Sequence, residues 1–334
     1  MPTDTFSCYL VTKDDAGHVH TRIAEKQIDE LPPGDVLIHV AYSSLNYKDA
    51  LSATGHTGVT RKYPHIPGID AAGAVAHSSS ANFRAGDQVL VTGYDLGQNT
   101  WGGFSEYVRV PAGWVVPLPS GLSLRESMIY GTAGFTAAQS VDALMHRGIA
   151  PGHGEVVVTG ATGGVGSLAV AMLAKLGYQV AASTGKATAA DYLTMLGAAK
   201  IVPRSDVHDT SEKPLLPSRW AGAVDTVGGT TLATLVRSLD RAGCVAACGL
   251  VGGVQLPLTV YPFLLRGADL VGIDSAECPL AKRIELWQRM ATTWKPACLD
   301  KIATEVDLAH VGPQIEEILA GRVTGRVLVT PVVG

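Results

Sequence analysis

The sequence is poor in cysteine, in aromatic residues and in charge. Of its 334 residues only five are cysteine, 6% are aromatic and 17% are charged, while 46% are hydrophobic. Five scattered cysteines do not build a disulfide framework, so we expect reduced thiols. Few aromatic rings and a net charge of −4 exclude the stacking platforms and basic surface of a nucleic-acid-binding protein. The composition predicts a globular protein of about two domains.

Long hydrophobic runs are also missing. The most apolar region, residues 244–274, is interrupted by Gln255, two prolines, Arg266 and several glycines, so it is not expected to span a membrane. The first residues show no basic stretch followed by an apolar run, the pattern of a secretory signal. Cys244 and Cys248 form a close pair in a run typical of a buried strand, and no second Cys/His pair lies near them. We expect a cytoplasmic protein in which these two cysteines are core residues.

The rhythm of the chain changes at about residue 151. Before residue 119, short β-rich runs alternate with Gly, Pro, Asn and Asp, which is typical of an antiparallel barrel or sandwich. From residue 151, nearly continuous apolar runs alternate with helix-length segments, which predicts a doubly wound parallel α/β sheet. The last β-like run, residues 326–333, is more like the first part. The two ends are therefore expected to form one discontinuous domain.

The strongest local signal is the glycine-rich run EVVVTGATGGVGSLAVAMLAKLG at residues 155–177. Its glycines lie between an apolar strand and an amphipathic helix. There glycine permits a tight turn, close approach of a pyrophosphate to backbone N–H groups, and close packing of helix on strand. The pattern predicts a dinucleotide site. The predicted contacts in this turn are Gly163, Gly164, Val165 and Gly166.

The second strand of this region selects the phosphorylated cofactor. It ends in AASTGKA, and the next acid, Asp191, comes only within the following helix. NAD-preferring sites usually end this strand with Asp or Glu, which would repel a 2′-phosphate. NADPH is therefore favoured. The residues predicted to hold its 2′-phosphate are Ser183, Thr184, Gly185, Lys186 and Arg204, although Arg204 is equally well a solvated strand end.

Several strings of the chain together resemble the medium-chain dehydrogenase/reductase superfamily, and more narrowly its zinc-free acrylyl-CoA reductase branch, whose members are quinone oxidoreductase-like. The similarity runs from Tyr9 to Val329. The resemblance implies a Rossmann NADPH-binding domain at 123–267, inserted in a GroES-like β-rich catalytic domain made of 1–122 and 268–334, and a homodimer. The strings are SSLNYKDAL (43–51), PGIDAAG (67–73), WGGFSEYV (101–108), GTAGFTA (131–137), WAGAVDTVGG (220–229), CVAACGL (244–250) and GIDS (272–275).

The zinc enzymes of this superfamily place a Cys, a His in a Gly-His-Glu string and a later Cys around the metal. This sequence has Asn46, Ile69 in Gly-Ile-Asp, and a GTAGFTA segment without a thiol. No cysteine occurs between Cys8 and Cys244, so the four-cysteine structural zinc lobe is missing as well. Because isoleucine cannot coordinate a cation, we expect no metal.

Without a Lewis acid, hydride transfer suits an activated C=C whose enolate is stabilised by hydrogen bonds. The resemblance implies reduction of acrylyl-CoA to propanoyl-CoA, with hydride added to the β-carbon and a proton to the α-carbon. An NADPH:quinone oxidoreductase of the same fold is an alternative. A non-catalytic NADPH-binding sensor or structural protein is another.

The resemblance also implies roles for single residues. Tyr47 is expected beside the nicotinamide as a hydrogen-bond donor or cofactor contact, the alternative being a packed tyrosine. Asn46 is expected to orient a carboxamide, ribose or thioester oxygen. Asp70 is either part of the catalytic group or purely structural. The proton donor stays open, because solvent serves as well. Expected contacts of the nicotinamide half are Leu250, Leu264 and Ser275.

A CoA thioester carries phosphates that need cations. Candidates are Arg61, Lys62, Arg322 and Arg326, each of which is alternatively a solvated surface charge. The chain departs from the branch at Tyr94 and Asp95, where Trp and Gly are usual. If that loop lines the acyl pocket, acyl preference changes with it.

Overall fold

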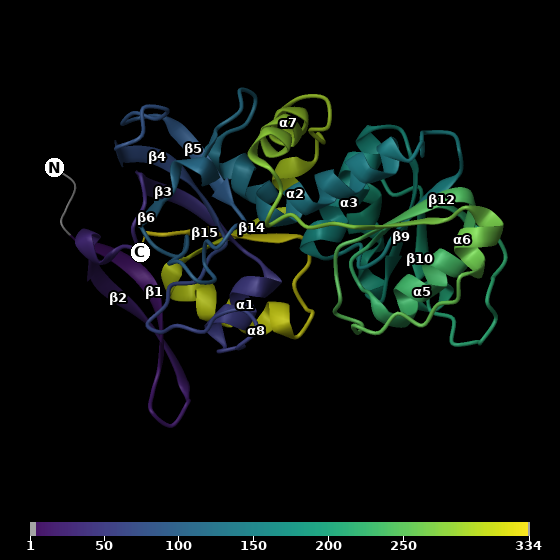
Figure 1. Ribbon diagram of the computed structural model, residues 1–334, viewed down its shortest axis with the longest axis horizontal. Helices are drawn as coiled ribbons and strands as arrows, with labels where there is room; N and C mark the ends of the chain where they lie inside the picture. Colours follow the sequence, from purple (N-terminus) through teal and green to yellow (C-terminus); the bar gives the residue numbers. More distant parts are fainter. Residues whose placement is uncertain (1–4, 333–334) are drawn as a thin grey trace. The chain divides into compact units, whose positions relative to one another are not determined.

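The computed structural model describes residues 5–332, and the chain divides into two compact units (Figure 1). Unit 1 contains Met1–Thr132, Ala276–Ala291 and Leu299–Gly334, and unit 2 contains Ala133–Ser275 and Thr292–Cys298. The predicted boundary at residue 268 is wrong in one respect. It would separate β13 (Asp269–Gly272) from unit 2, yet β13 pairs with β12 (Leu239–Ala247) in the sheet of that unit.

Unit 1 is β-rich, as its alternating runs predict. A two-stranded antiparallel hairpin stands beside a seven-stranded sheet with the order β14-β15-β3-β4-β5-β7, in which β6 also pairs with β3. The last strand, β15, lies antiparallel to β3, so the C-terminal run completes the sheet begun near the N-terminus. The strands are β1 (Thr5–Lys13), β2 (Val19–Gln27), β3 (Val36–Leu45), β4 (Asp70–Ser78), β5 (Gln88–Thr92), β6 (Tyr107–Val110), β7 (Val116–Pro117), β14 (Ala303–Asp307) and β15 (Arg326–Thr330).

Helices close the ends of this sheet. One buried cluster joins β1, β15 and the short helix α1, with Phe6, Leu45 and Phe104 among its fully buried side chains. A second cluster fills the space among β3, β4, β5 and β6. The helices of unit 1 are α1 (Tyr47–Ala53), α7 (Leu280–Ala291) and α8 (Val311–Leu319), and α1 packs against α8.

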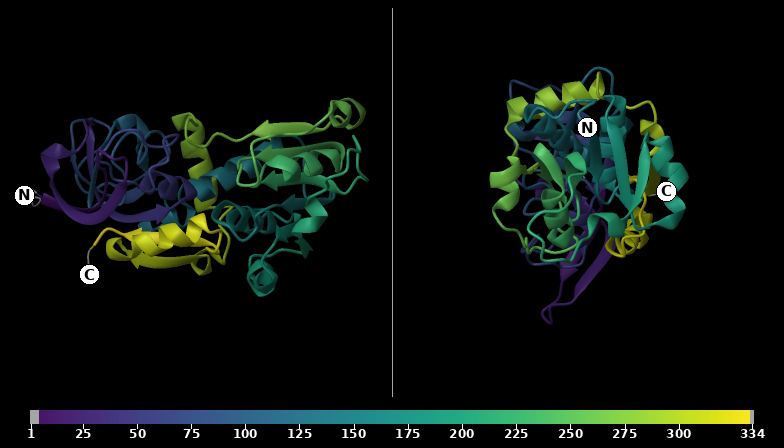
Figure 2. Two further views of the ribbon diagram at one scale, coloured as in Figure 1. Left: turned by 90° about the horizontal axis from the view of Figure 1, so that it is seen from below. Right: turned by 90° about the vertical axis from the view of Figure 1, so that its right-hand side faces the viewer.

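Unit 2 contains a six-stranded sheet with the order β10-β9-β8-β11-β12-β13, parallel throughout. Helices lie on both of its faces (Figure 2), which explains why its central strands are buried on both sides and read as unbroken apolar runs. This is the predicted doubly wound α/β sheet. Its other strands are β8 (Glu155–Val158), β9 (Gln179–Thr184), β10 (Lys200–Pro203) and β11 (Trp220–Asp225).

The helices of unit 2 follow the strands in the order expected for a doubly wound sheet. α3 packs on β8 and β9, and α5 packs on β11 and β12. None of the helices within residues 5–332 is both long and apolar enough to cross a membrane. The helices are α2 (Leu124–His146, which begins in unit 1), α3 (Gly164–Lys175), α4 (Ala190–Met195), α5 (Gly229–Arg237) and α6 (Tyr261–Arg266).

Candidate functional site

The glycine turn joins β8 to α3 at the carboxyl edge of the parallel sheet. Gly160 has a φ of 56°, in the left-handed region, and a Cβ there would overlap the Thr226 hydroxyl. A Cβ on Gly166 would overlap the carbonyl oxygen of Gly160 and lie 2.8 Å from the Cα of Ala161. Two of the glycines are therefore required for the turn and for the contact of α3 with it.

The first turn of α3 presents backbone donors. Gly163 precedes the helix, and the amide groups of Gly164, Val165 and Gly166 have no backbone acceptor within residues 5–332. Of the four residues 163–166, three are glycines, and the fourth, Val165, carries no charge. A helix N-terminus of this kind suits a pyrophosphate, because unpaired N–H groups and the helix dipole both favour an anion.

The end of β9 lies beside this turn, and the amide of Ala161 donates to the carbonyl oxygen of Ser183 at 3.1 Å. Pro203 pairs with Thr184 across β9 and β10, so Arg204 follows directly alongside. The Arg204 guanidinium comes within 3.0 Å of where a Cβ of Gly185 would stand. Burial lowers the pKa of Lys186. The structure thus brings together the residues predicted to bind the 2′-phosphate.

A buried acid that the sequence reasoning missed shapes the neighbouring loop. Asp225, at the end of β11, accepts hydrogen bonds from the Thr159 hydroxyl at 2.6 Å and from the amide of Gly228 at 2.7 Å. Burial raises the pKa of Asp225. The acid ends a strand in the string AVDTVGG, a position from which its carboxylate reaches the backbone of the next loop. It links the glycine turn to the loop after β11.

The three residues assigned to the nicotinamide half lie in different places. Leu250 follows β12 at the carboxyl edge, with its Cα 3.0 Å from where a Cβ of Gly228 would stand. The Ser275 hydroxyl accepts a hydrogen bond from Thr136 at 2.9 Å. Leu264, whose assignment to the nicotinamide half stays a prediction, lies on α6 two residues before Arg266, and the Arg266 guanidinium donates to the carbonyl of Leu239 at the amino end of β12. It is thus near the opposite edge of the sheet from the glycine turn.

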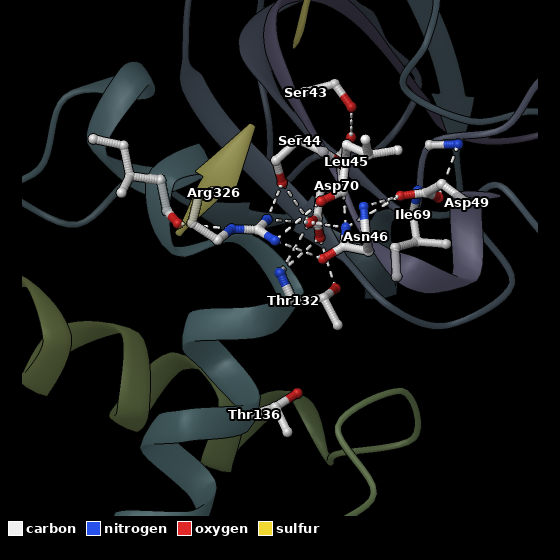
Figure 3. A network of polar contacts seen from close by, with 12 residues as sticks. Ser43, Ser44, Leu45, Asn46, Asp49, Ile69, Asp70, Thr132, Thr136 and Arg326 are labelled. Atoms are coloured by element: carbon white, nitrogen blue, oxygen red, sulfur yellow. Dashed lines mark hydrogen bonds and ion pairs between the residues drawn. The ribbon is translucent and has the colours of Figure 1, made fainter. Parts of the chain in front are cut away.

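Unit 1 contains a buried polar network around Asp70, the first residue of β4 (Figure 3). Asp70 is fully buried, and every donor that reaches its carboxylate comes from outside β4. The donors are the Ser44 hydroxyl (2.6 Å), the Asn46 side-chain amide (2.7 Å), the Thr132 hydroxyl (2.6 Å) and the Thr132 backbone amide (2.9 and 3.0 Å). Asp70 is thus an internal group whose carboxylate is satisfied by hydrogen bonds within unit 1.

Arg326 lies on the other side of this carboxylate, 3.7 Å from it. Only 3% of Arg326 is exposed, so its prediction as a cation for CoA phosphate is wrong. Figure 3 shows that the Arg326 guanidinium is hydrogen-bonded to groups inside unit 1. Burial lowers the pKa of Arg326, while the two nearby carboxylates raise it. The guanidinium donates to the carbonyl of Ile129 (3.1 Å), the carbonyl of Leu45 (3.1 Å), the side-chain oxygen of Asn46 (3.1 Å) and the Ser44 hydroxyl (2.7 Å).

Asn46 connects this pair to the start of α1. Its side-chain amide donates to Asp70 and its oxygen accepts from Arg326, so the expected contact of this amide with a ligand is replaced by internal bonds. Its backbone amide donates to Asp49 at 2.8 Å. Asp49 also accepts from the amide of Ile69 at 2.8 Å. Burial first, and then the charge of Asp70, raise the pKa of Asp49 to about 7.

Tyr47 follows Asn46 as the first residue of α1. Its side chain is 42% exposed, unlike the buried Asn46 and Asp49 on either side. Tyr47 is therefore an exposed residue on a backbone that the buried network holds.

Of the other residues assigned to substrate, Arg61 and Lys62 are exposed on the segment after α1. Arg322 makes two bonds to Glu317, at 2.8 and 2.6 Å, and this carboxylate raises its pKa. The Tyr94 ring stacks on Trp114 with ring centroids 5.3 Å apart, and the Arg283 guanidinium lies 4.5 Å from the Tyr94 ring centroid. Tyr94 is therefore packed within unit 1.

The positions that correspond to zinc ligands do not form a ligand set. Ile69 is buried, and Asn46 is bonded to Asp70, Asp49 and Arg326. Within residues 5–332, no three or more His, Cys, Asp or Glu side chains are grouped so as to hold a metal ion.

Comparison with known proteins agrees with this geometry. Residues 32–120 match the family described as alcohol dehydrogenase GroES-like domain, and residues 164–292 match the zinc-binding dehydrogenase family. The chain is 47% identical to acrylyl-CoA reductase AcuI of Ruegeria pomeroyi, covering 97% of this chain and 98% of that protein. It is 49% identical to the putative quinone oxidoreductase YhfP of Bacillus subtilis, covering 96% of this chain and 97% of that one.

A solved structure is equally similar. The yhdH oxidoreductase from Salmonella enterica, crystallised with NADP, has a TM-score of 0.94 and 47% identity, and the match covers 97% of this chain and 99% of that one. The resemblance inferred from the motifs is thereby confirmed. This chain belongs to the acrylyl-CoA reductase branch of the medium-chain dehydrogenase/reductase superfamily.

Proposed function

We propose that this protein is an NADPH-dependent enoyl-CoA reductase that converts acrylyl-CoA to propanoyl-CoA. The observation that carries the proposal is the pairing of two features. One is a glycine turn beside a strand end with Lys186 and Arg204 and no acid. The other is the replacement of zinc ligands by Asn46 and Ile69. The first suits NADPH and the second suits an alkene already activated by a thioester.

The residues of the glycine turn fit this cofactor. Bare backbone donors at the start of α3 are placed for the pyrophosphate, and the cations at the end of β9 and β10 for the 2′-phosphate. When bound, NADPH supplies a hydride for the β-carbon of the thioester. The chain then has to stabilise negative charge on the thioester oxygen until the α-carbon takes a proton.

Tyr47 is the residue we assign to that task. Tyr47 is 42% exposed, whereas Asn46 and Asp70 are buried and occupied by bonds inside unit 1. A phenol hydroxyl can donate one hydrogen bond to the oxygen of a developing enolate. The α-proton then comes from this hydroxyl or from solvent. We assign the phosphates of CoA to Arg61 and Lys62, the exposed cations after α1.

The cofactor assignment predicts a change of preference in Lys186→Asp. The new carboxylate would repel the 2′-phosphate of NADPH. The ribose hydroxyls of NADH could instead donate hydrogen bonds to it. We expect the Kd for NADPH to rise about 100-fold and the Kd for NADH to change less than about threefold, measured by fluorescence titration. Lys175→Asp is the control, because it makes the same charge change at the far end of α3. Equal effects of Lys186→Asp on both cofactors would refute the phosphate role.

The substrate assignment is tested by following NADPH absorbance with acrylyl-CoA, crotonyl-CoA and a benzoquinone. Rapid turnover of acrylyl-CoA supports the proposal. The identity to a putative quinone oxidoreductase makes an NADPH:quinone oxidoreductase the second candidate. Turnover of the quinone alone would replace the first candidate with the second. Binding of NADPH without any turnover would favour a non-catalytic sensor or structural role.

We also propose that the protein is a cytoplasmic homodimer joined through unit 2. Its free thiols agree with a reducing compartment. The segment after β12 exposes large hydrophobic side chains, and β13 is the edge strand of its sheet. An open edge beside an apolar surface is a typical place for a second copy to dock. The exposed residues are Val251, Val254, Val260, Tyr261, Leu264 and Leu265.

The dimer proposal predicts that Leu264→Glu produces a monomer. Leu264 is 75% exposed in the isolated chain, so the substitution should leave the folded monomer intact while burying an unpaired carboxylate in the interface. Light scattering coupled to gel filtration measures the mass. Met145→Glu, at an exposed apolar residue of α2, is expected to leave the mass unchanged. A wild-type protein that is already monomeric would contradict the proposal.

A further inference from the structure

The buried network in unit 1 links segments that lie far apart in the chain. Arg326 at the start of β15 contacts the end of β3, and it contacts the carbonyl of Ile129, 197 residues away. Asp70 adds the backbone amide of Thr132, just after the kink in α2. One buried ion pair thus joins four segments: the end of β3, the kink of α2, and the starts of β4 and β15.

These are the segments whose side chains would otherwise surround a metal. Asn46, Ile69 and the GTAGFTA string take the places of the zinc ligands. Asn46 is bonded to Asp70, the amide of Ile69 donates to Asp49, and Thr132 of the string donates to Asp70. A zinc ion holds its ligand segments together by coordination. Here the Arg326 guanidinium donates to several groups and the Asp70 carboxylate accepts from several. The ion pair therefore also holds several segments together.

The connection reaches Tyr47 through a single residue. Asn46 is held on its side chain by both Asp70 and Arg326, and on its backbone by Asp49. Tyr47 is next in the chain and begins α1. A rotation of Asn46 would therefore change the direction of the exposed Tyr47, although neither Asp70 nor Arg326 is itself exposed.

We propose that Arg326 and Asp70 are positioning residues for hydride transfer, which act by fixing Asn46 and so the direction of Tyr47. This rests on the proposed reductase function and adds residues that do not touch substrate. A buried ion pair is weak evidence for a gain in stability, since its desolvation offsets its attraction. Its retention is better explained by the single geometry it imposes, which a catalytic hydrogen bond requires.

Arg326→Lys tests the proposal, because lysine keeps the positive charge but has three donors at one point instead of a planar fork. It can face Asp70 but cannot also hold both Asn46 and the carbonyls of Leu45 and Ile129. We expect kcat with acrylyl-CoA to fall about 30-fold, with KM changed less than about threefold and NADPH affinity unchanged. Arg109→Lys is the matched control. Arg109 also donates to two backbone carbonyls of unit 1, at Leu31 and Ile28.

A double-mutant cycle identifies the route. If Arg326 acts through Tyr47, Arg326→Lys and Tyr47→Phe together should lower kcat little more than the more severe of the two alone. Losses that multiply would show that Arg326 acts elsewhere and would overturn the proposal. If Arg326 served only the stability of unit 1, Arg326→Lys would have a lower melting temperature and an unchanged kcat per folded molecule. That result would also overturn the proposal.

Amide hydrogen exchange separates this proposal from the reductase assignment, because it needs no substrate. In Arg326→Lys we expect faster exchange in Tyr47–Ala53 and at Thr132, with β1 and β2 unchanged. If the wild type reduces no enoyl-CoA, this exchange pattern still supports the positioning role, and its absence overturns it. Should Arg326→Lys not fold, Ser44→Ala removes one contact to each partner without changing charge. It should then lower kcat about fivefold, and an unchanged kcat would overturn the proposal.

Discussion

Gly166→Ala is expected to weaken NADPH binding by about 100-fold and to destabilise unit 2 by about 2 kcal/mol. The added Cβ would overlap the carbonyl oxygen of Gly160 and approach the Cα of Ala161 to 2.8 Å, and both are backbone atoms of a tight turn. Neither can move without changing the turn, because Gly160 already has a left-handed φ of 56° and is closely packed against Thr226. The start of α3 must shift instead. The backbone donors meant for the pyrophosphate move with it.

Gly163→Ala distinguishes this effect from a general intolerance of side chains in the turn. Its Cβ would lie 3.4 Å from the carbonyl oxygen of Gly160, an ordinary contact, and its φ is −80°. We expect Gly163→Ala to keep the melting temperature of the ligand-free protein while weakening NADPH binding, because a methyl group beside the backbone donors of α3 would crowd a pyrophosphate. Scanning calorimetry and fluorescence titration measure the two quantities. An unchanged melting temperature in Gly166→Ala would contradict the close packing of α3 on the turn.

The dinucleotide-binding unit was predictable because its signals are local. The glycines, the strand before them and the helix after them lie within 23 residues, and the missing acid at Ser183–Lys186 is read in the same way. Each signal depends on backbone conformation and on neighbours in the chain. Nothing distant has to be known for the pattern to be interpreted.

The network around Asp70 was not predictable for the opposite reason. Arg326 is 256 residues from Asp70, and in a sequence it looks like any cation at the start of a strand. The available signal is the position of Arg326 at the start of the apolar run VLVT, because a charged side chain buried in a core requires a partner. Asp70 carried the same signal at the head of a strand whose next residues are Ala, Ala and Gly. Two opposite charges at the heads of two buried strands favour pairing with one another, but the sequence does not show that these two strands lie close together.

Leu264 shows a second limit of sequence reasoning. Its assignment to the cofactor came from resemblance alone, and a leucine is compatible with a core, a ligand contact or an interface. The sheet topology separates it from the glycine turn within one chain, because α6 leads into β13 and therefore ends near the amino edge of the parallel strands. The glycine turn lies at the carboxyl edge.

Gly131→Ala is expected to lower the melting temperature of unit 1 by about 10 °C and to reduce kcat more than tenfold. Gly131 lies at the kink of α2 with φ 50° and ψ −156°, a conformation that costs an L-residue about 1–3 kcal/mol. A Cβ would also overlap the Asp70 carboxylate and come within 2.5 Å of the Ser44 hydroxyl and 2.9 Å of the Arg326 guanidinium. Overpacking of this kind adds about 1–3 kcal/mol, and each kcal/mol lowers the melting temperature of a unit this size by about 2–4 °C.

The substitution is informative because it changes no charge and removes no donor or acceptor. It acts on Asp70 and Arg326 through the added Cβ and the strained backbone at residue 131, so a loss of kcat at a temperature where the variant is folded reports the geometry of the network. Gly113→Ala is the control in the same unit, since a Cβ there meets nothing within 4 Å. Thermal unfolding followed by circular dichroism, and steady-state kinetics well below the transition, measure the two effects. If Gly131→Ala unfolds early yet keeps wild-type kcat when folded, the network serves the fold alone, and the positioning role of Arg326 fails with it.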